Sequence, residues 1–284
     1  MRFRSASELD VLNKVTWRNI FMETTNSIFK GKVFFQANFS NVAFESIEIS
    51  PPFPGVAKAV IEASSEGVSL EVEISSADTP DSAIAKAKEV ATYIAKLLTF
   101  EFCEFHQEFR VINKFLEVEI RLPDGSAQTA IYDAVGMMQM VSAEAPKKLN
   151  ETQVEQLKEL LERSYPHSYN YDFFYFAVGL EEPISKFMCL YNIMLSLCND
   201  DQEEVDDFIC KMQPGVATSI SPIKSKKKEK KETVYTRLRN EVAHSRPGTT
   251  IQATREEIEK NLDGFIRLTR EIIVRRALEA DNDR

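Results

Sequence analysis

The segment RLRNEVAHSR, at positions 237–246, contains the residues whose types and spacing are best suited to chemistry. Asn240 directly follows Arg239, and His244 comes five residues after Arg239. A guanidinium binds phosphate through two donors and stabilises charge on a pentacoordinate phosphorus. A histidine titrates near neutral pH and can move protons to or from a ribose 2′-OH or a leaving 5′-oxygen. These residues form a candidate site for phosphodiester cleavage.

Asn240 and His244 lie four residues apart, so on a helix they share one face, and the amide could orient the imidazole or a phosphate oxygen. The local chemistry leaves an alternative open, in which His244 interacts with a helix dipole and Arg239 is an ordinary surface cation. This reaction needs no metal ion. The four cysteines form no C-x-x-C pair, and no histidine lies near a cysteine pair. We expect no metal and no cofactor.

Positive charge is concentrated around this motif. The whole chain has a formal charge of −9, but residues 221–246 contain nine basic and three acidic residues, so this window carries +6 and the remainder −15. Clustered cations are the electrostatic footprint of a polyanion site, although a lysine run is also typical of a solvated, mobile loop, here residues 213–232. The residues expected to bind the RNA backbone are Lys226, Lys227, Lys228, Lys230, Lys231, Arg237 and Arg246.

The pattern R-N-x-x-x-H, formed by Arg239, Asn240 and His244, resembles the signature of the HEPN (higher eukaryotes and prokaryotes nucleotide-binding) superfamily. The C-terminal half is also similar to bacterial HEPN-like proteins, including one associated with methylamine utilisation gene clusters. The resemblance, over roughly residues 150 to 280, implies a helical bundle and a metal-independent ribonuclease in which two motifs of a dimer form one site. The 2′-OH then attacks to leave a cyclic phosphate. Other members keep the bundle and cleave nothing.

Helical periodicity dominates the second half of the chain. Asn150 with Gln153, and Thr254 with Glu257, have the spacing of capping boxes. Asp200 or Asp201 is a candidate N-cap, and Asp206 with Asp207 is expected on a solvated face. The aromatic run at 165–176 is assigned to packing, with a base-stacking surface as the alternative. The expected helices are 150–163, 183–198, 205–212, 232–244 and 254–276.

Strand patterns dominate the first half. Apolar residues alternate with polar ones at Val68–Ile74 and Leu116–Leu122, as in half-buried strands. Further strands are expected at 32–39 and 42–49, and residues 127–134 can return as a hairpin partner after a turn at 123–125. Helices are expected after a cap at Thr79 and at 11–29. The sequence predicts an α+β fold, with a β-rich domain of mainly antiparallel sheet at 1–146 and an all-α HEPN-like bundle at 147–284.

The composition of the chain excludes several classes of protein. With 43% hydrophobic and 28% charged residues, the chain is neither disordered nor a small disulfide scaffold. The start MRFRSASELD has no apolar core typical of a signal peptide, and no apolar stretch is long enough to span a bilayer. We expect a cytoplasmic protein with reduced cysteines and no membrane partner.

The expected function is a metal-independent endoribonuclease of HEPN type, as in toxins and defence effectors. The alternative is a catalytically inactive HEPN-like nucleotide-binding or scaffold protein. The expected partners are RNA or a nucleotide and a second copy of the chain bound through the C-terminal bundle. A sensor or protein-binding role is assigned to the N-terminal domain, because no chemistry is visible in it.

Overall fold

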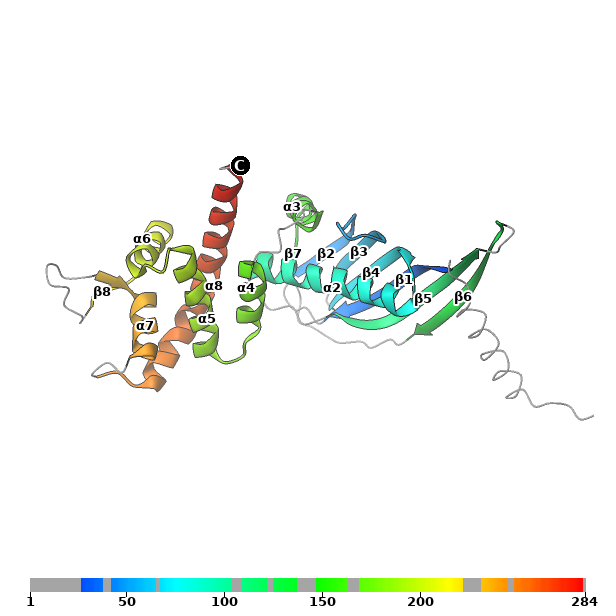
Figure 1. Ribbon diagram of the computed structural model, residues 1–284. Coiled ribbons are helices and arrows are strands. Elements are labelled where there is room, and N and C mark those ends of the chain that lie inside the picture. The colour runs from blue at the N-terminus through cyan, green and yellow to red at the C-terminus, as the bar shows by residue number, and fades with distance from the viewer. Residues whose placement is uncertain are drawn as a thin grey trace, which may run out of the picture. The chain divides into compact units, whose positions relative to one another are not determined.

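The computed structural model describes residues 27–37, 42–64, 67–103, 109–121, 125–136, 147–162, 169–221, 231–244 and 248–282 (Figure 1). Contacts divide the chain into two compact units. The sheet unit comprises Met1–Ile94 and Glu108–Ser164, and the helical unit comprises Ala95–Gln107 and Tyr165–Arg284. Strands dominate the first unit and helices the second, which confirms the α+β fold class.

Seven strands form the sheet of the first unit, in the order β6-β5-β1-β4-β3-β2-β7. Neighbouring strands are antiparallel, apart from β2 and the short β7, which are parallel. The expected hairpin is present as β5 and β6, whereas β3 was not expected. The strands are β1 (Ser27–Ala37), β2 (Val42–Ile49), β3 (Val56–Ser64), β4 (Gly67–Ala77), β5 (Arg110–Arg121), β6 (Ala127–Gly136) and β7 (Lys147–Lys148).

Helix α2 (Pro80–Phe102) lies along one face of this sheet (Figure 1). Its first turn is capped as expected, because the Thr79 hydroxyl accepts a hydrogen bond from the Ser82 N–H at 3.0 Å. The alternation of the strands places their apolar residues beneath the helix, and Val33, Phe35 and Val72 are fully buried there. The helix expected over 11–29 lies mostly outside the described residues, and its last three positions begin β1 instead.

Gly31 determines how closely β1 and β5 approach each other. Its φ is +145°, a conformation that only glycine adopts without strain. A Cβ atom at this position would lie 2.1 Å from the carbonyl oxygen of Phe115 in β5. Glycine is therefore required here, and the β1–β4 register shifts between Phe29 and Gly31.

Charged residues pair across neighbouring strands on the face of the sheet that α2 does not cover. Each pair joins a lysine to a glutamate on the next strand, which is the favourable arrangement for directly opposed or diagonal positions. The pairs are Lys30 with Glu119 at 2.7 Å, Lys32 with Glu71 at 2.6 Å and Lys58 with Glu48 at 2.9 Å.

Helix α3 (Glu151–Glu162) belongs to the sheet unit, although the sequence placed it in the bundle. The expected capping box is present: the Asn150 N–H donates to the Gln153 side chain at 3.1 Å, and the Gln153 N–H donates to the Asn150 side chain at 2.9 Å. The helix packs on β2 and buries Leu157 and Leu161. The change between units thus falls near residue 164 rather than 146.

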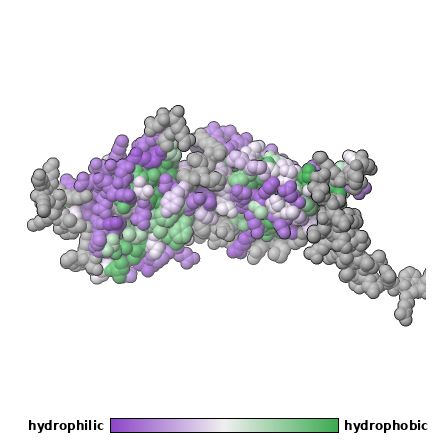
Figure 2. Space-filling model, viewed as in Figure 1, coloured by the Kyte–Doolittle hydropathy of each residue, from purple (hydrophilic) through white to green (hydrophobic). Residues whose placement is uncertain are grey.

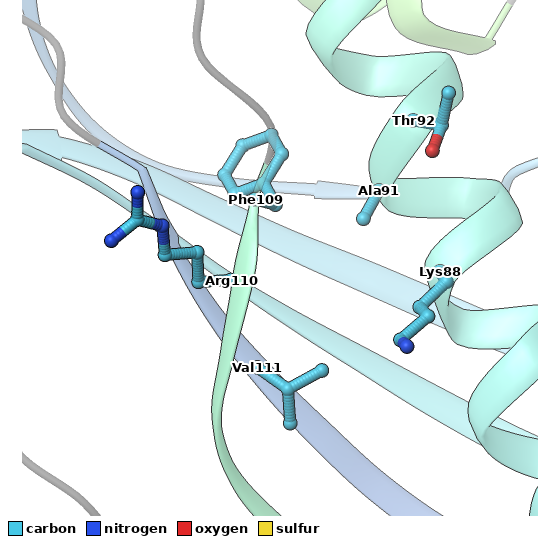
Figure 3. A pocket seen from close by; sticks show the side chains of 6 residues that line it. All are labelled: Lys88, Ala91, Thr92, Phe109, Arg110 and Val111. Carbon is cyan, nitrogen blue, oxygen red and sulfur yellow. The ribbon is translucent and has the colours of Figure 1, made fainter.

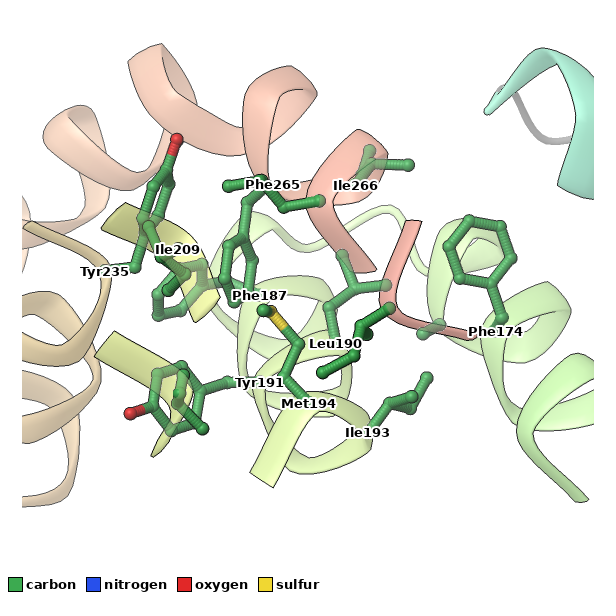
Figure 4. Packing of buried hydrophobic residues seen from close by; sticks show 14 of the residues in the cluster. Phe174, Phe187, Leu190, Tyr191, Ile193, Met194, Ile209, Tyr235, Phe265 and Ile266 are labelled. Carbon is green, nitrogen blue, oxygen red and sulfur yellow. The ribbon is translucent and has the colours of Figure 1, made fainter. Parts of the chain in front are cut away.

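Five helices and a short hairpin make up the described C-terminal part of the helical unit. Side chains of α5, α7 and α8 meet in its core, where the rings of Tyr191 and Tyr235 each stack on Phe265 and Phe187 packs beside them (Figure 4). The elements are α4 (Tyr169–Gly179), α5 (Pro183–Leu197), α6 (Gln202–Met212), β8 (Thr218–Ile220), β9 (Lys231–Thr233), α7 (Val234–Ala243) and α8 (Ile251–Asn282).

Three local features of this unit differ from the sequence expectation. Helix α4 was not expected. The region 213–232, expected to be a loop throughout, contributes the antiparallel strands β8 and β9. Helix α8 starts at Ile251, where the Thr250 hydroxyl accepts from the Ala253 N–H at 3.2 Å. The buried Thr254 is therefore inside the helix and is not its cap.

Polar residues cover much of the described surface (Figure 2). No helix within the described ranges combines the length and the apolar character needed to cross a bilayer. None of the four cysteines, all in the described part of the chain, forms a disulfide bond. Cys198 is buried, whereas Cys210 is exposed.

Candidate anion-binding site on helix α7

A buried carboxylate fixes the first turn of α7, the helix that carries the motif. One oxygen of Asp206, on α6, accepts hydrogen bonds from the Thr233 N–H at 3.0 Å, the Thr233 hydroxyl at 2.7 Å and the Thr236 hydroxyl at 2.7 Å. Thr233 is the N-cap of α7, so the negative charge also lies at the favourable end of the helix dipole. Asp206 is 7% exposed, and its assignment to a solvated face was wrong, while Asp207 is exposed.

Tyr191, on α5, extends this hydrogen-bonded chain into the core. Its phenolic oxygen lies 2.9 Å from the Thr236 hydroxyl. Burial raises the pKa of the Tyr191 phenol above its ordinary value, so the phenol keeps its proton. Because Thr236 donates its only hydroxyl proton to Asp206, Tyr191 is the donor to Thr236. The chain Tyr191–Thr236–Asp206 thereby ties α5, α7 and α6 together.

The guanidinium of Arg239 is held on two sides. Its Cζ atom lies 5.8 Å from the centre of the Tyr191 ring, within cation–π range. Its Nη1 donates to the side-chain oxygen of Asn240 at 3.0 Å. Its Nε is buried and has no hydrogen-bond partner among the described residues. The side chain as a whole is half-buried.

Asn240 orients Arg239 and not His244. The amide is 5% exposed, its nitrogen donates to the buried Glu232 at 3.2 Å, and its oxygen accepts from Arg239 and, at 3.4 Å, from Gln202. The amide was expected to orient the imidazole or a phosphate oxygen, and it instead holds the guanidinium of Arg239. Spacing four residues apart puts two side chains on one helix face, but the burial of Asn240 directs its amide inward.

His244 is the C-cap residue of α7, and its side chain is exposed. Its backbone N–H donates to the Asn240 carbonyl at 2.9 Å, the last hydrogen bond of the helix. The imidazole is therefore accessible to a bound molecule.

The expected RNA-binding cations differ in their environments. Lys231 begins β9 and is exposed. Arg237 instead pairs with Glu241 at 2.6 Å and with Glu257 of α8, and the second Glu241 oxygen accepts from the Thr254 hydroxyl at 2.9 Å. The guanidinium of Arg237 therefore joins α7 to α8. Lys226, Lys227, Lys228, Lys230 and Arg246 lie outside the described residues.

Four residues around Arg239 were not selected from the sequence. They were missed because the sequence alone does not show which polar residues of a helix are buried and which face solvent. Asp206 carries one available signal, since it directly follows Val205 and lies three residues before Ile209, both fully buried. The four are Tyr191, Gln202, Asp206 and Glu232.

No three histidine, cysteine, aspartate or glutamate side chains are grouped to hold a metal ion in the part of the chain that the structure describes. The candidate site consists of the guanidinium of Arg239, which the Asn240 amide and the Tyr191 ring hold in place, on the helix that ends at the exposed His244. No family model, no curated protein and no solved structure matches this chain.

Proposed function

We propose that this protein is a metal-independent endoribonuclease of HEPN type that acts as a homodimer through its helical unit. The observation that carries the proposal is the fixed guanidinium of Arg239 on the helix that ends at the exposed His244. A cation aimed by its neighbours stabilises developing charge without reorganising during the reaction. The cytoplasm and a role as a toxin or defence effector are the proposed setting.

The proposed reaction breaks one P–O bond and forms another. His244 takes the proton of a ribose 2′-OH, and the 2′-oxygen attacks the adjacent phosphorus. Arg239 binds the phosphate oxygens and stabilises the extra negative charge on the pentacoordinate phosphorus. The 5′-oxygen leaves with a proton, for which the second His244 of the dimer is the proposed donor. The products are a 2′,3′-cyclic phosphate and a 5′-hydroxyl end. Lys231 attracts the RNA backbone.

The test is cleavage of a mixed RNA panel by the purified full-length protein in EDTA, with the product ends identified. We expect 2′,3′-cyclic phosphates, and a loss of about 100-fold or more in kcat/KM for His244→Ala and for Arg239→Ala. Arg255→Ala is the matched control, because Arg255 lies in the same unit and forms an exposed pair with Glu259. Its activity should stay close to that of the unaltered protein.

A second candidate, a catalytically inactive nucleotide-binding or scaffold protein, is favoured by one observation. A catalytic histidine is ordinarily oriented by a hydrogen bond, and none of the described residues provides one to the His244 imidazole. If the intact dimer cleaves no RNA in the panel but binds a nucleotide, and Arg239→Ala abolishes that binding, the second candidate replaces the first.

A further inference from the structure

A groove in the sheet unit lies between α2 and the start of β5, far along the sequence from the motif on α7. Its volume is about 380 Å³, within the range of small-molecule sites. Lys88, Ala91 and Thr92 line it from α2, and Phe109 lines it together with Arg110 and Val111 at the start of β5 (Figure 3). All six of these residues belong to the sheet unit.

The floor of the groove is apolar. Ala91 is 2% exposed, Phe109 and Val111 are half-buried, and Val111 points from β5 toward α2 (Figure 3). Val111 lies opposite the fully buried Phe35, which confirms that it is on the inner face of the sheet. The side chain of Arg110 points to the other side of β5 (Figure 3). The wall thus offers an aromatic ring and aliphatic groups to a ligand.

Two polar side chains line the groove from α2, and the ammonium of Lys88 extends away from Thr92 (Figure 3). Lys88 and Thr92 are four residues apart on α2, so their side chains lie on the same helix face. No acidic side chain among the described residues pairs with Lys88, whereas Lys86 donates to the Ser76 carbonyl and Lys96 pairs with Asp172. The ammonium of Lys88 provides a positive charge and hydrogen-bond donors for a carboxylate.

We propose that this groove binds an apolar monocarboxylic acid, with the carboxylate at Lys88 and the apolar chain against Ala91, Phe109 and Val111. The positive charge of Lys88 favours a negatively charged ligand, and the apolar floor favours a ligand with an apolar chain. This site would give the sheet unit a ligand-binding role that does not depend on the ribonuclease proposal.

Isothermal titration of the full-length chain with octanoate and with octan-1-ol tests this proposal. We expect saturable octanoate binding at one site and weaker binding of the alcohol. Lys88→Met removes the charge of an exposed side chain without shortening it, and it should weaken octanoate binding about fivefold while leaving the alcohol unaffected. Lys148→Met is the matched control, because Lys148 is exposed in the same unit and lies away from the groove lining.

Phe109→Ser probes the apolar floor independently of charge. It should weaken the acid and the alcohol by similar factors, because both place their chains against the ring. Two results would overturn the proposal: octanoate that does not bind saturably, or octanoate that binds Lys88→Met as tightly as the unaltered protein. Circular dichroism of each variant distinguishes lost binding from lost folding.

Discussion

The helical unit buries two acidic side chains, whereas the lysine–glutamate pairs of the sheet unit lie on an exposed face. In the sheet unit, the lysine–glutamate pairs lie on the exposed face, with the apolar residues on the inner face. In the helical unit, Asp206, Glu232 and Asn240 are buried around one helix and hold its polar groups in place. Exposed pairs contribute little to stability, whereas a buried polar group is costly unless all its partners are present. The comparison indicates that, among the described residues, buried polar side chains fix the position of α7 in the helical unit and play no such part in the sheet unit.

The largest expected effect is on stability, and it comes from removing the buried carboxylate of Asp206. Asp206→Ala removes the acceptor of three hydrogen bonds and leaves two hydroxyls and one N–H buried without it. We expect a loss of about 3 kcal/mol in the free energy of unfolding, measured by urea denaturation and circular dichroism. Asp207→Ala, at the exposed neighbouring position, should stay within about 0.5 kcal/mol of the unaltered protein. Equal effects of the two substitutions would contradict the comparison.

A matched pair of ion-pair variants compares the two units directly. Arg237→Met leaves Glu241, whose side chain is only 5% exposed, without its cation, and should cost about 2 kcal/mol, between the values for exposed and buried pairs. Lys58→Met breaks an exposed pair in the sheet and should not change stability measurably. Hydrogen–deuterium exchange locates each effect, and faster exchange in α7 is expected for Arg237→Met only.

The smallest effect concerns how the two units respond to pH. Glu182 caps α5, and its carboxylate accepts from the Ile184 and Ser185 N–H groups. Desolvation acts to raise the pKa of Glu182, but these hydrogen bonds outweigh it and lower the pKa below 4.5. The stabilisation is therefore present above pH 4.5 and is lost as the pH falls through the folded-state pKa. The stability difference between the unaltered protein and Glu182→Gln should shrink below pH 4.5.

The pairs of the sheet should respond at the other end of the pH scale. Hydrogen bonds to Glu71 and Glu48 raise the pKa values of Lys32 and Lys58 above 10.5. Their small contribution is present below pH 10.5 and is lost as the pH rises through the folded-state pKa. If Glu182→Gln and the unaltered protein have identical acid unfolding curves, the Glu182 cap does not contribute to the pH dependence of stability, and that prediction is wrong.

Local patterns were sufficient to predict most elements. The alternation at Val68–Ile74 identified β4, and the reciprocal bonds of Asn150 and Gln153 form as the capping box predicted. Helix α4 was missed because its residues are apolar on nearly all sides, so no helical period is visible in YNYDFFYFAVG. Strands β8 and β9 are three residues each, too short for a periodic signal.

The residues of the motif could be predicted from the sequence, but their side-chain partners on other helices could not. Arg239, Asn240 and His244 could be selected because their chemistry and spacing are local. The contact of Tyr191 with the guanidinium brings together residues 48 positions apart, and no local pattern contains it. The pairing of Arg237 with Glu257 similarly depends on how α7 packs on α8. Side-chain partners across helices are determined by tertiary packing.

Gly31 has a consequence for the gene as well as for the sheet. A side chain of any size at this position would collide with the backbone of β5, and the backbone conformation itself excludes other residues. Every base change that alters the meaning of a glycine codon introduces a side chain or a stop. No missense mutation at codon 31 can therefore be neutral for the pairing of β1 with β5, and the damage would arise from sterics alone, in a unit far along the chain from the motif on α7.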